Sequence, residues 1–191
     1  MTRSTAAAML DAAGRIRRGR LVDAVIRAAL LVDAADVRHI AERDDCVEVA
    51  STHTGFPPAD RLLDALVADD GATLGDVICN GPVGMEAVVI ELVQRGWWCR
   101  LPRSLARPTV RYRPQVPELP WRQAEVAPVV ELFLALFHAS TDLDDVVVES
   151  THAGTGAAAW IIPAAFHELV DLRSWLQAAV TTPHGGGGGG G

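Results

Sequence analysis

The sequence predicts a mainly α-helical protein, a single globular helical domain with short peripheral β-hairpins. Apolar residues recur at spacings of three and four in several segments, which is typical of amphipathic helices packed on a core. The β-prone segments are short and lie beside charged or proline-rich breaks, which favours hairpins over a large sheet. The length of 191 residues suits one well-buried domain and is short for two.

The first half of the chain contains two predicted helices separated by a hairpin. Residues 21–35 carry a wide apolar stripe and predict a helix packed on the core. The charged break at 42–45 separates two β-prone pieces and predicts a hairpin. After it, Pro57 and Pro58 suit the first turn of a short helix, which Gly71 ends.

Three more predicted helices follow along the chain. One runs over 83–95, and Gly96 follows where a left-handed C-cap belongs. The sequence "TVRYR" predicts an edge strand within a proline-rich stretch. Residues 126–137 are apolar nearly all round, so we expect a central helix covered on every side. A last amphipathic helix follows Pro163.

The ends of the chain and its hydropathy suggest where the protein acts. No run approaches the roughly 18 apolar residues that a membrane span requires, and the N-terminal segment has the wrong order of basic and apolar residues for a secretory signal. We therefore expect a cytoplasmic protein, with any membrane association peripheral. The helical domain is predicted over 8–182, between a flexible N-terminus at 1–7 and a disordered glycine tail at 183–191.

The charge of the chain is unevenly distributed. The net charge is −7, yet all 17 basic residues are arginine, and they crowd 15–20 and 95–122, where Glu118 is the sole acid of the second stretch. Guanidinium groups bind phosphate in a bidentate manner, so these stretches indicate an anionic partner. A compositional preference for arginine, with ordinary solvated side chains, explains the same pattern, and composition alone favours that explanation.

No motif in the chain indicates catalysis. The segment "NGPVGMEAVVIELVQRGWWC" lacks both G-x-G-x-x-G and a preceding apolar strand, so a nucleotide-binding fold is not predicted. His53, His138, His152 and His167 belong to no H-E-x-x-H or nucleophile-elbow pattern, and the three cysteines are widely spaced. We expect neither an enzyme nor a resident metal or other cofactor, and an enzyme using His53 is the least supported hypothesis.

Two stretches nearly repeat each other, "VEVASTHTG" at 47–55 and "VVVESTHAG" at 146–154. We interpret them as Val-rich extended segments that meet similar Ser/Thr/Gly turn chemistry, not as a duplicated active site. In the first copy the residue expected to matter is Gly55 rather than His53.

Five segments resemble, in order, those of the Golgi phosphoprotein 3 family, which has many bacterial members. They are "AMLDAAGRIRRG", "RLVDAVIRAALLVDAADVRHI", "THTGFPPADRLLDALV", "VVIELVQRGWW" and "LFLALFHASTDL", and together they cover about residues 8–145. The resemblance implies a helical adaptor that is not an enzyme. Eukaryotic members bind phosphatidylinositol 4-phosphate through a shallow basic pocket and also bind cytoplasmic tails of glycosyltransferases.

The resemblance also implies where a lipid headgroup binds. The pocket arginine of the family falls on Arg27, its aromatic residue on or near Arg18, and its two other basic residues near Pro82 and Met85, so the pocket is only partly retained. We expect Arg27 and Arg18, together with Arg17, to contact the phosphate. A structural role for Arg27 carries equal weight, because a buried arginine inside an apolar helix requires a partner, such as Asp23 or Asp64.

Trp97 and Trp98 are candidate membrane contacts, because indole rings favour the membrane interface. For one of the two rings a place in the core is the preferred interpretation, and the other ring stays open to either role, because adjacent residues generally cannot both face inward.

The leading hypothesis is a peripheral membrane adaptor that binds anionic, phosphoinositide-like phospholipid headgroups. The alternative is a soluble protein-interaction module of the same fold that has a protein partner and no lipid binding. No nucleic-acid partner is predicted, and the sequence does not define the oligomeric state. The lipid hypothesis requires the arginines of the two stretches to share one face of the folded domain.

Overall fold

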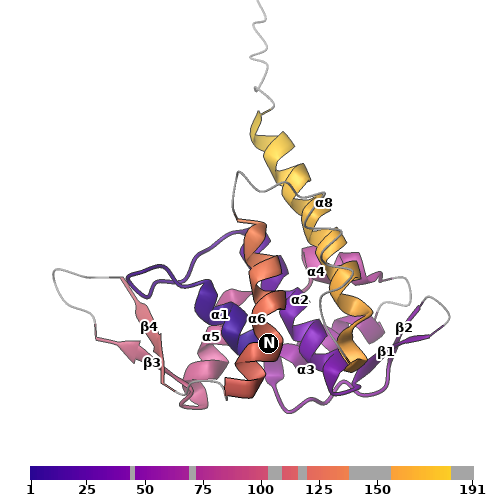
Figure 1. Ribbon diagram of the computed structural model, residues 1–191, viewed down its shortest axis with the longest axis horizontal. Helices are drawn as coiled ribbons and strands as arrows, with labels where there is room; N and C mark the ends of the chain where they lie inside the picture. The colour runs from indigo at the N-terminus through magenta and orange to yellow at the C-terminus, as the bar shows by residue number, and fades with distance from the viewer. Residues whose placement is uncertain (44–45, 69–71, 103–108, 116–119, 138–155, 182–191) are drawn as a thin grey trace, which may run out of the picture.

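A computed structural model describes residues 1–43, 46–68, 72–102, 109–115, 120–137 and 156–181 (Figure 1). Helices make up most of this part of the chain, accompanied by two small antiparallel hairpins, which confirms the predicted mainly α-helical fold. Several features considered in the sequence lie outside the described residues: Arg103, Arg107, His138, His152, the second near-repeat at 146–154 and the tail at 183–191.

The central element is α2 (Arg20–Asp36), of which 12 of 17 residues are buried. It contacts helices on several sides, namely α1 (Thr2–Ala8), α3 (Pro57–Ala68), α4 (Leu74–Asn80), α5 (Met85–Gln94) and α8 (Ile161–Thr181). Alanine occupies many of the buried positions of α2, which lets neighbouring helices approach closely. The stripe predicted at 21–35 is thus the core of the domain.

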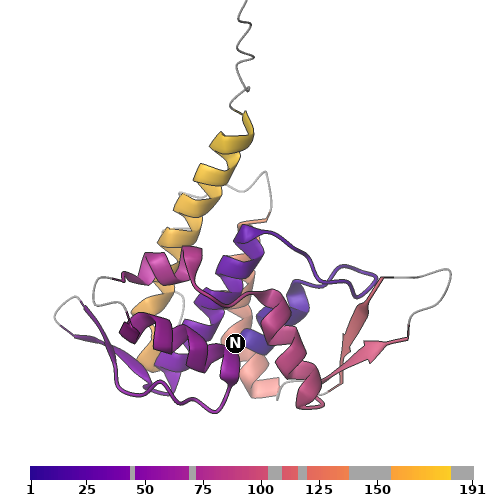
Figure 2. The ribbon, with the colours of Figure 1, turned by 180° about the vertical axis from the view of Figure 1, so that it is seen from behind.

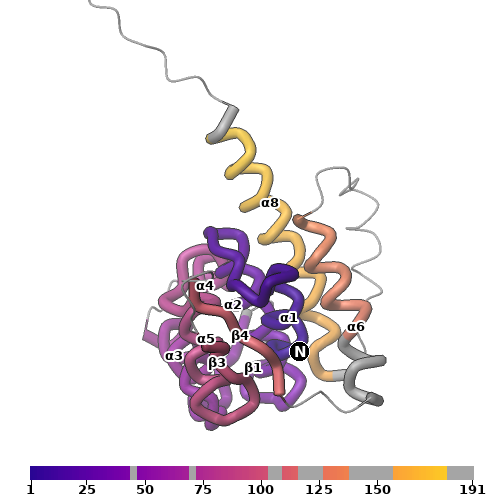
Figure 3. Tube along the Cα trace, turned by 90° about the vertical axis from the view of Figure 1, so that its left-hand side faces the viewer, coloured from indigo at the N-terminus to yellow at the C-terminus, as the bar shows by residue number. Residues whose placement is uncertain are grey.

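Helix α6 (Pro120–Ala135) contradicts the expectation of a central helix at 126–137. Its Val129 and Phe133 are buried, but Pro128 and Glu131 are exposed. The helix packs against α1 at the outside of the body (Figure 3). The prediction was wrong because it relied on the large share of apolar residues in this segment. Glu131 marks a side of the helix that faces solvent.

The segment 1–7, predicted to be flexible, is instead part of the folded body. It forms α1, whose Thr5 and Ala6 are fully buried. The Asp33 carboxylate on α2 accepts a hydrogen bond from the backbone N–H of Thr2 at 2.8 Å, which satisfies an N-terminal N–H of the helix. This capping group lies 31 residues away, so the local sequence does not reveal it.

The two hairpins lie at opposite ends of the helical body (Figures 1 and 2). The predicted hairpin around 42–45 is confirmed, since β1 (Ile40–Arg43) pairs with β2 (Cys46–Val49). At the other end, β3 (Trp98–Leu101) pairs with β4 (Arg111–Pro114) in the register Arg100 opposite Tyr112. The edge strand predicted from "TVRYR" corresponds to β4.

The long helix α8 packs on α2 and α4 through its first half, while its last turns extend beyond the body (Figures 1 and 3). A short 3-10 helix, η1 (Gly156–Ala158), precedes it and also contacts α2. Within the described ranges, no helix combines the length and the apolarity that crossing a bilayer requires.

Candidate functional site

Arg27 is buried in the core, with 5% of its surface exposed. Its Nε donates to the Ile78 carbonyl at 2.5 Å, Nη2 to that of Cys79 at 2.9 Å, and Nη1 to that of Val83 at 2.8 Å. A longer contact of 3.3 Å joins Nη1 to the Gly81 carbonyl. Because α4 ends at Asn80, this guanidinium satisfies carbonyls that the end of the helix leaves open.

Asp23 lies one turn before Arg27 and holds the other end of the same connection. Its carboxylate accepts the backbone N–H of Met85, the first residue of α5, at 2.8 Å. A side chain at Gly84 would meet this carboxylate, since a Cβ there would lie 2.6 Å from Oδ1. The two side chains thus fix both ends of the link between α4 and α5.

This geometry gives Arg27 a structural role, which was one of the two hypotheses for this residue, the other being contact with a lipid headgroup. Backbone carbonyls, not Asp23 or Asp64, are the hydrogen-bond partners of its guanidinium. Burial lowers the pKa of Arg27, and the nearby carboxylate of Asp23 opposes this shift. Met85, one of the positions aligned with a basic pocket residue, is itself buried in the core. The expected contact between Arg27 and a lipid headgroup therefore conflicts with where its donors point.

Arg17 and Arg18 lie on the surface, in the loop that joins α1 to α2. The loop folds back on itself through a bridge between Leu10 and Ile16. Asp11 organises its turn by accepting the backbone N–H of Arg15 at 2.9 Å and its Nε at 2.6 Å. These hydrogen bonds from the backbone and side chain of Arg15 lower the pKa of Asp11.

The same loop approaches the β3–β4 hairpin closely at Gly14. The backbone N–H of Tyr112 in β4 donates to the carbonyl of Gly14 at 2.7 Å. Gly14 has φ of +77°, and a Cβ at this position would lie 2.6 Å from the Tyr112 carbonyl oxygen. Only glycine accommodates both the left-handed backbone and this distance. The two arginine-rich stretches of the sequence therefore meet at Gly14 and Tyr112.

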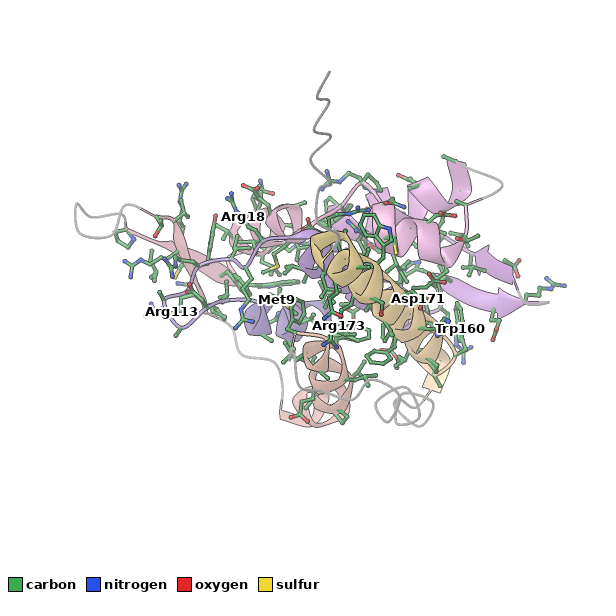
Figure 4. The ribbon with its side chains drawn as sticks, turned by 90° about the horizontal axis from the view of Figure 1, so that it is seen from above. Met9, Arg18, Arg113, Trp160, Asp171 and Arg173 are labelled. Atoms are coloured by element: carbon green, nitrogen blue, oxygen red, sulfur yellow. The ribbon has the colours of Figure 1, made fainter. Side chains whose placement is uncertain are left out.

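We call this region the basic end and define it as residues 10–19, 98–102 and 109–115. It contains six arginines and one acidic residue, Asp11, which gives a formal charge of +5 (6 − 1) within a chain of net charge −7. The arginines come from both stretches, as Figure 4 illustrates with Arg18 and Arg113. They are Arg15, Arg17, Arg18, Arg100, Arg111 and Arg113. Arg27, in contrast, is not part of this surface.

The adjacent tryptophans have different environments. Trp98 is 2% exposed, so it is the ring of the pair that lies in the core and it is not placed to contact a membrane. Trp97 is partly buried, and the guanidinium groups of Arg3 and Arg95 lie 4.8 and 5.3 Å from its ring centroid. These cation–π contacts hold the partly buried ring against the body, and a membrane contact of Trp97 stays a prediction.

His53 lies in the turn before α3 and lacks the surroundings of a catalytic residue. Its side chain is 89% exposed, and its Nδ1 lies 3.6 Å from Asp60 Oδ2. Asp60 accepts the backbone N–H of Thr54 at 2.7 Å and its hydroxyl at 2.5 Å. Gly55 has φ of +75°, in keeping with the importance expected of it for the turn. In the described part of the chain, no cluster of His, Cys, Asp and Glu is arranged to hold a metal ion.

Sequence reasoning missed α4, the helix on which the role of Arg27 depends. Thr73 caps this helix by accepting the backbone N–H of Asp76, while the Asp76 carboxylate accepts the backbone N–H of Thr73. The Thr-x-x-Asp spacing was the available signal, a variant of the capping box. The exposed Trp175 on α8 was also missed as a surface feature.

Comparisons with known protein families, with curated proteins and with solved structures find no match to this chain. The resemblance to the Golgi phosphoprotein 3 family thus stays a prediction that rests on the five sequence segments.

Proposed function

We propose that this protein is a peripheral membrane adaptor that binds anionic phospholipid headgroups through the basic end. The observation that carries the proposal is the junction of Gly14 with Tyr112, which brings together arginines from two distant stretches. Arginine suits phosphate because its planar guanidinium donates two parallel hydrogen bonds. The site differs from the pocket that the resemblance implies, since Arg27 is used inside the fold.

The charge distribution favours an extended anionic surface over a single small anion. Each arginine near an anionic membrane contributes ~1 kcal/mol, so several arginines together are needed for stable attachment. The rest of the chain is acidic and is repelled by the same surface. In this proposal the basic end faces the lipid, and the remainder of the chain, which is acidic in total, faces the cytoplasm and a protein partner.

Vesicle flotation tests the proposal. The full chain is mixed with neutral phosphatidylcholine vesicles and with vesicles that also contain phosphatidylserine, cardiolipin or phosphatidylinositol 4-phosphate, at low and high salt. We expect binding to every anionic vesicle at low salt, its loss at high salt, and none to neutral vesicles. Because no headgroup pocket is involved, vesicles of equal charge density bind similarly.

Two charge-matched variants locate the surface. Arg18→Glu changes the basic end, whereas Arg61→Glu makes the same change at an exposed position on α3. Arg18→Glu weakens flotation and Arg61→Glu leaves it nearly unchanged. Absence of binding at low salt, or equal losses in both variants, overturns the proposal. Equally tight binding to a DNA duplex also contradicts it, because the basic end then recognises polyanions in general.

A second candidate is a protein-interaction module that has kept the fold without lipid binding. The burial of Met85 and the internal use of Arg27 favour it, since the headgroup pocket implied by the resemblance is occupied by the protein itself. A stoichiometric protein partner recovered equally by the wild-type chain and Arg18→Glu, with no flotation of either, supports this candidate.

A further inference from the structure

The last turns of α8, residues 174–181, carry no charged side chain, although the helix extends beyond the body there. The preceding Arg173 is buried, and the exposed residues that follow are Ser174, Trp175, Gln177, Ala178 and Ala179. Trp175 is 56% exposed, among the largest apolar exposures of the described residues. A ring of this size is unusual on a helix surface that faces water, and so is the absence of charge, although Ser174 and Gln177 are polar. We call residues 174–181 the α8 tip.

The α8 tip adjoins the basic end. The guanidinium of Arg20 lies 5.0 Å from the centroid of the Trp175 ring. Arg20 begins α2 directly after Gly19, the last residue of the loop that carries Arg17 and Arg18. Figures 1 and 2 agree that this loop reaches α2 on the side from which α8 projects. Trp175 and the arginines of the loop are thus on one side of the molecule.

We propose that Trp175 and the α8 tip insert into the interfacial layer of the same anionic membrane, an inference that rests on the proposed function. Indole rings favour the headgroup level, where an apolar ring and a polar N–H are both accommodated. Arg20 beside the ring places a cation at the depth of the phosphates. The basic end and Trp175 then supply two different attractions, one electrostatic and one apolar, and stable anchoring generally requires two such signals.

The tip is too short to cross a membrane. Eight residues at ~1.5 Å each span roughly 12 Å, whereas the hydrocarbon core is ~30 Å thick. A tip that lies along the interface keeps Trp175 and the end of α8 at the same level. The positive charge of the adjoining basic end is complementary to an anionic membrane, which is therefore the surface that we propose the tip contacts.

Tryptophan quenching tests this inference in the full chain. Vesicles of phosphatidylserine and phosphatidylcholine with brominated acyl chains quench indole rings that enter the membrane. Trp175→Phe removes the proposed ring with little change in shape, and Trp97→Phe is the matched control that also lacks one tryptophan. We expect quenching in the wild type and Trp97→Phe, and loss of most of it in Trp175→Phe. Trp175→Ala weakens vesicle partitioning roughly tenfold, as expected for removal of a partly buried apolar side chain.

The outcomes separate the two proposals. If the wild-type chain does not bind the vesicles, the proposed function itself fails. If it binds but Trp175→Phe is quenched like the wild type, the basic end holds the protein without the α8 tip, and this inference alone is overturned. A dimer in sedimentation that Trp175→Ala dissociates also overturns it, because a second copy of the chain then covers the tip. Thermal unfolding monitored by circular dichroism verifies that each variant is folded.

Discussion

Asp23 and Arg27, one turn apart on α2, fix opposite ends of the same connection. Arg27 donates hydrogen bonds to the carbonyls at the end of α4, and the Asp23 carboxylate accepts one from the first backbone N–H of α5. A single face of the central helix therefore sets the relative positions of two other helices. This arrangement explains why two charged residues occur in an otherwise apolar stripe, and why neither is available to an external ligand.

Replacement of Arg27 is expected to destabilise the fold rather than abolish binding selectively. Arg27→Ala leaves the buried carbonyls of Ile78, Cys79 and Val83 without their donor, which should lower the free energy of unfolding by about 2–4 kcal/mol. Arg27→Lys should recover only part of this loss. The lysine ammonium still donates hydrogen bonds, but it cannot reproduce the planar arrangement of donors of a guanidinium. Urea unfolding measures both, with Arg61→Ala as an exposed control. A stable Arg27→Ala that has lost only vesicle binding would show that Arg27 contacts the ligand.

Gly14 is expected to control the assembly of the basic end. In Gly14→Ala the new Cβ meets the Tyr112 carbonyl and forces the loop away from β4, in addition to the strain of a positive φ. Gly55→Ala is a close control, because Gly55 has φ of +75° and nothing within 4 Å of its Cβ position. Gly14→Ala should accelerate hydrogen exchange at the Tyr112 amide and reduce flotation with anionic vesicles. Equal effects of the two substitutions on flotation would contradict the role of this junction.

How much the sequence reveals depends on whether the signal is local. The stripe of α2 and the hairpin at 40–49 were predictable, because periodicity and turn residues act within one segment. Helix α1 was not, since Asp33 on another helix caps it. The sequence predicted the two arginine-rich stretches of the basic end. It did not predict the hydrogen bond between Gly14 and Tyr112 that brings them together, because these residues are far apart in the chain. The role of Arg27 was equally hidden, because its partners are backbone carbonyls, which every residue possesses.

The adjacent tryptophans should differ in their contribution to stability. Trp98→Ala removes a buried ring from the core and is expected to lower the free energy of unfolding by about 3–5 kcal/mol. Trp97→Ala loses the contacts with Arg3 and Arg95, each worth about 0.5–1 kcal/mol at such partly exposed positions. Chemical unfolding of both variants provides the comparison. Losses of the same size would show that Trp97 is also a core residue.

The turn before α3 is expected to make stability depend on pH through Asp60. Burial raises the pKa of Asp60, but hydrogen bonds from the hydroxyl and backbone N–H of Thr54 outweigh it, so the pKa lies below its usual value of 3.8. Because the pKa of the folded state is depressed, the carboxylate stabilises the protein above the pKa of the unfolded state. This stabilisation is lost as the pH falls through the pKa of the folded state.

Asp60→Asn should therefore be less stable than the wild type at neutral pH, and the difference should shrink as the solution becomes acidic. Urea unfolding across the pH range from neutral to below 3.8 measures the difference. Asp64→Asn, an exposed position one turn later on α3, is the control for the general effect of removing one negative charge. A difference between wild type and Asp60→Asn that stays constant with pH would mean that the hydrogen bonds from Thr54 do not discriminate between the charged and neutral carboxyl.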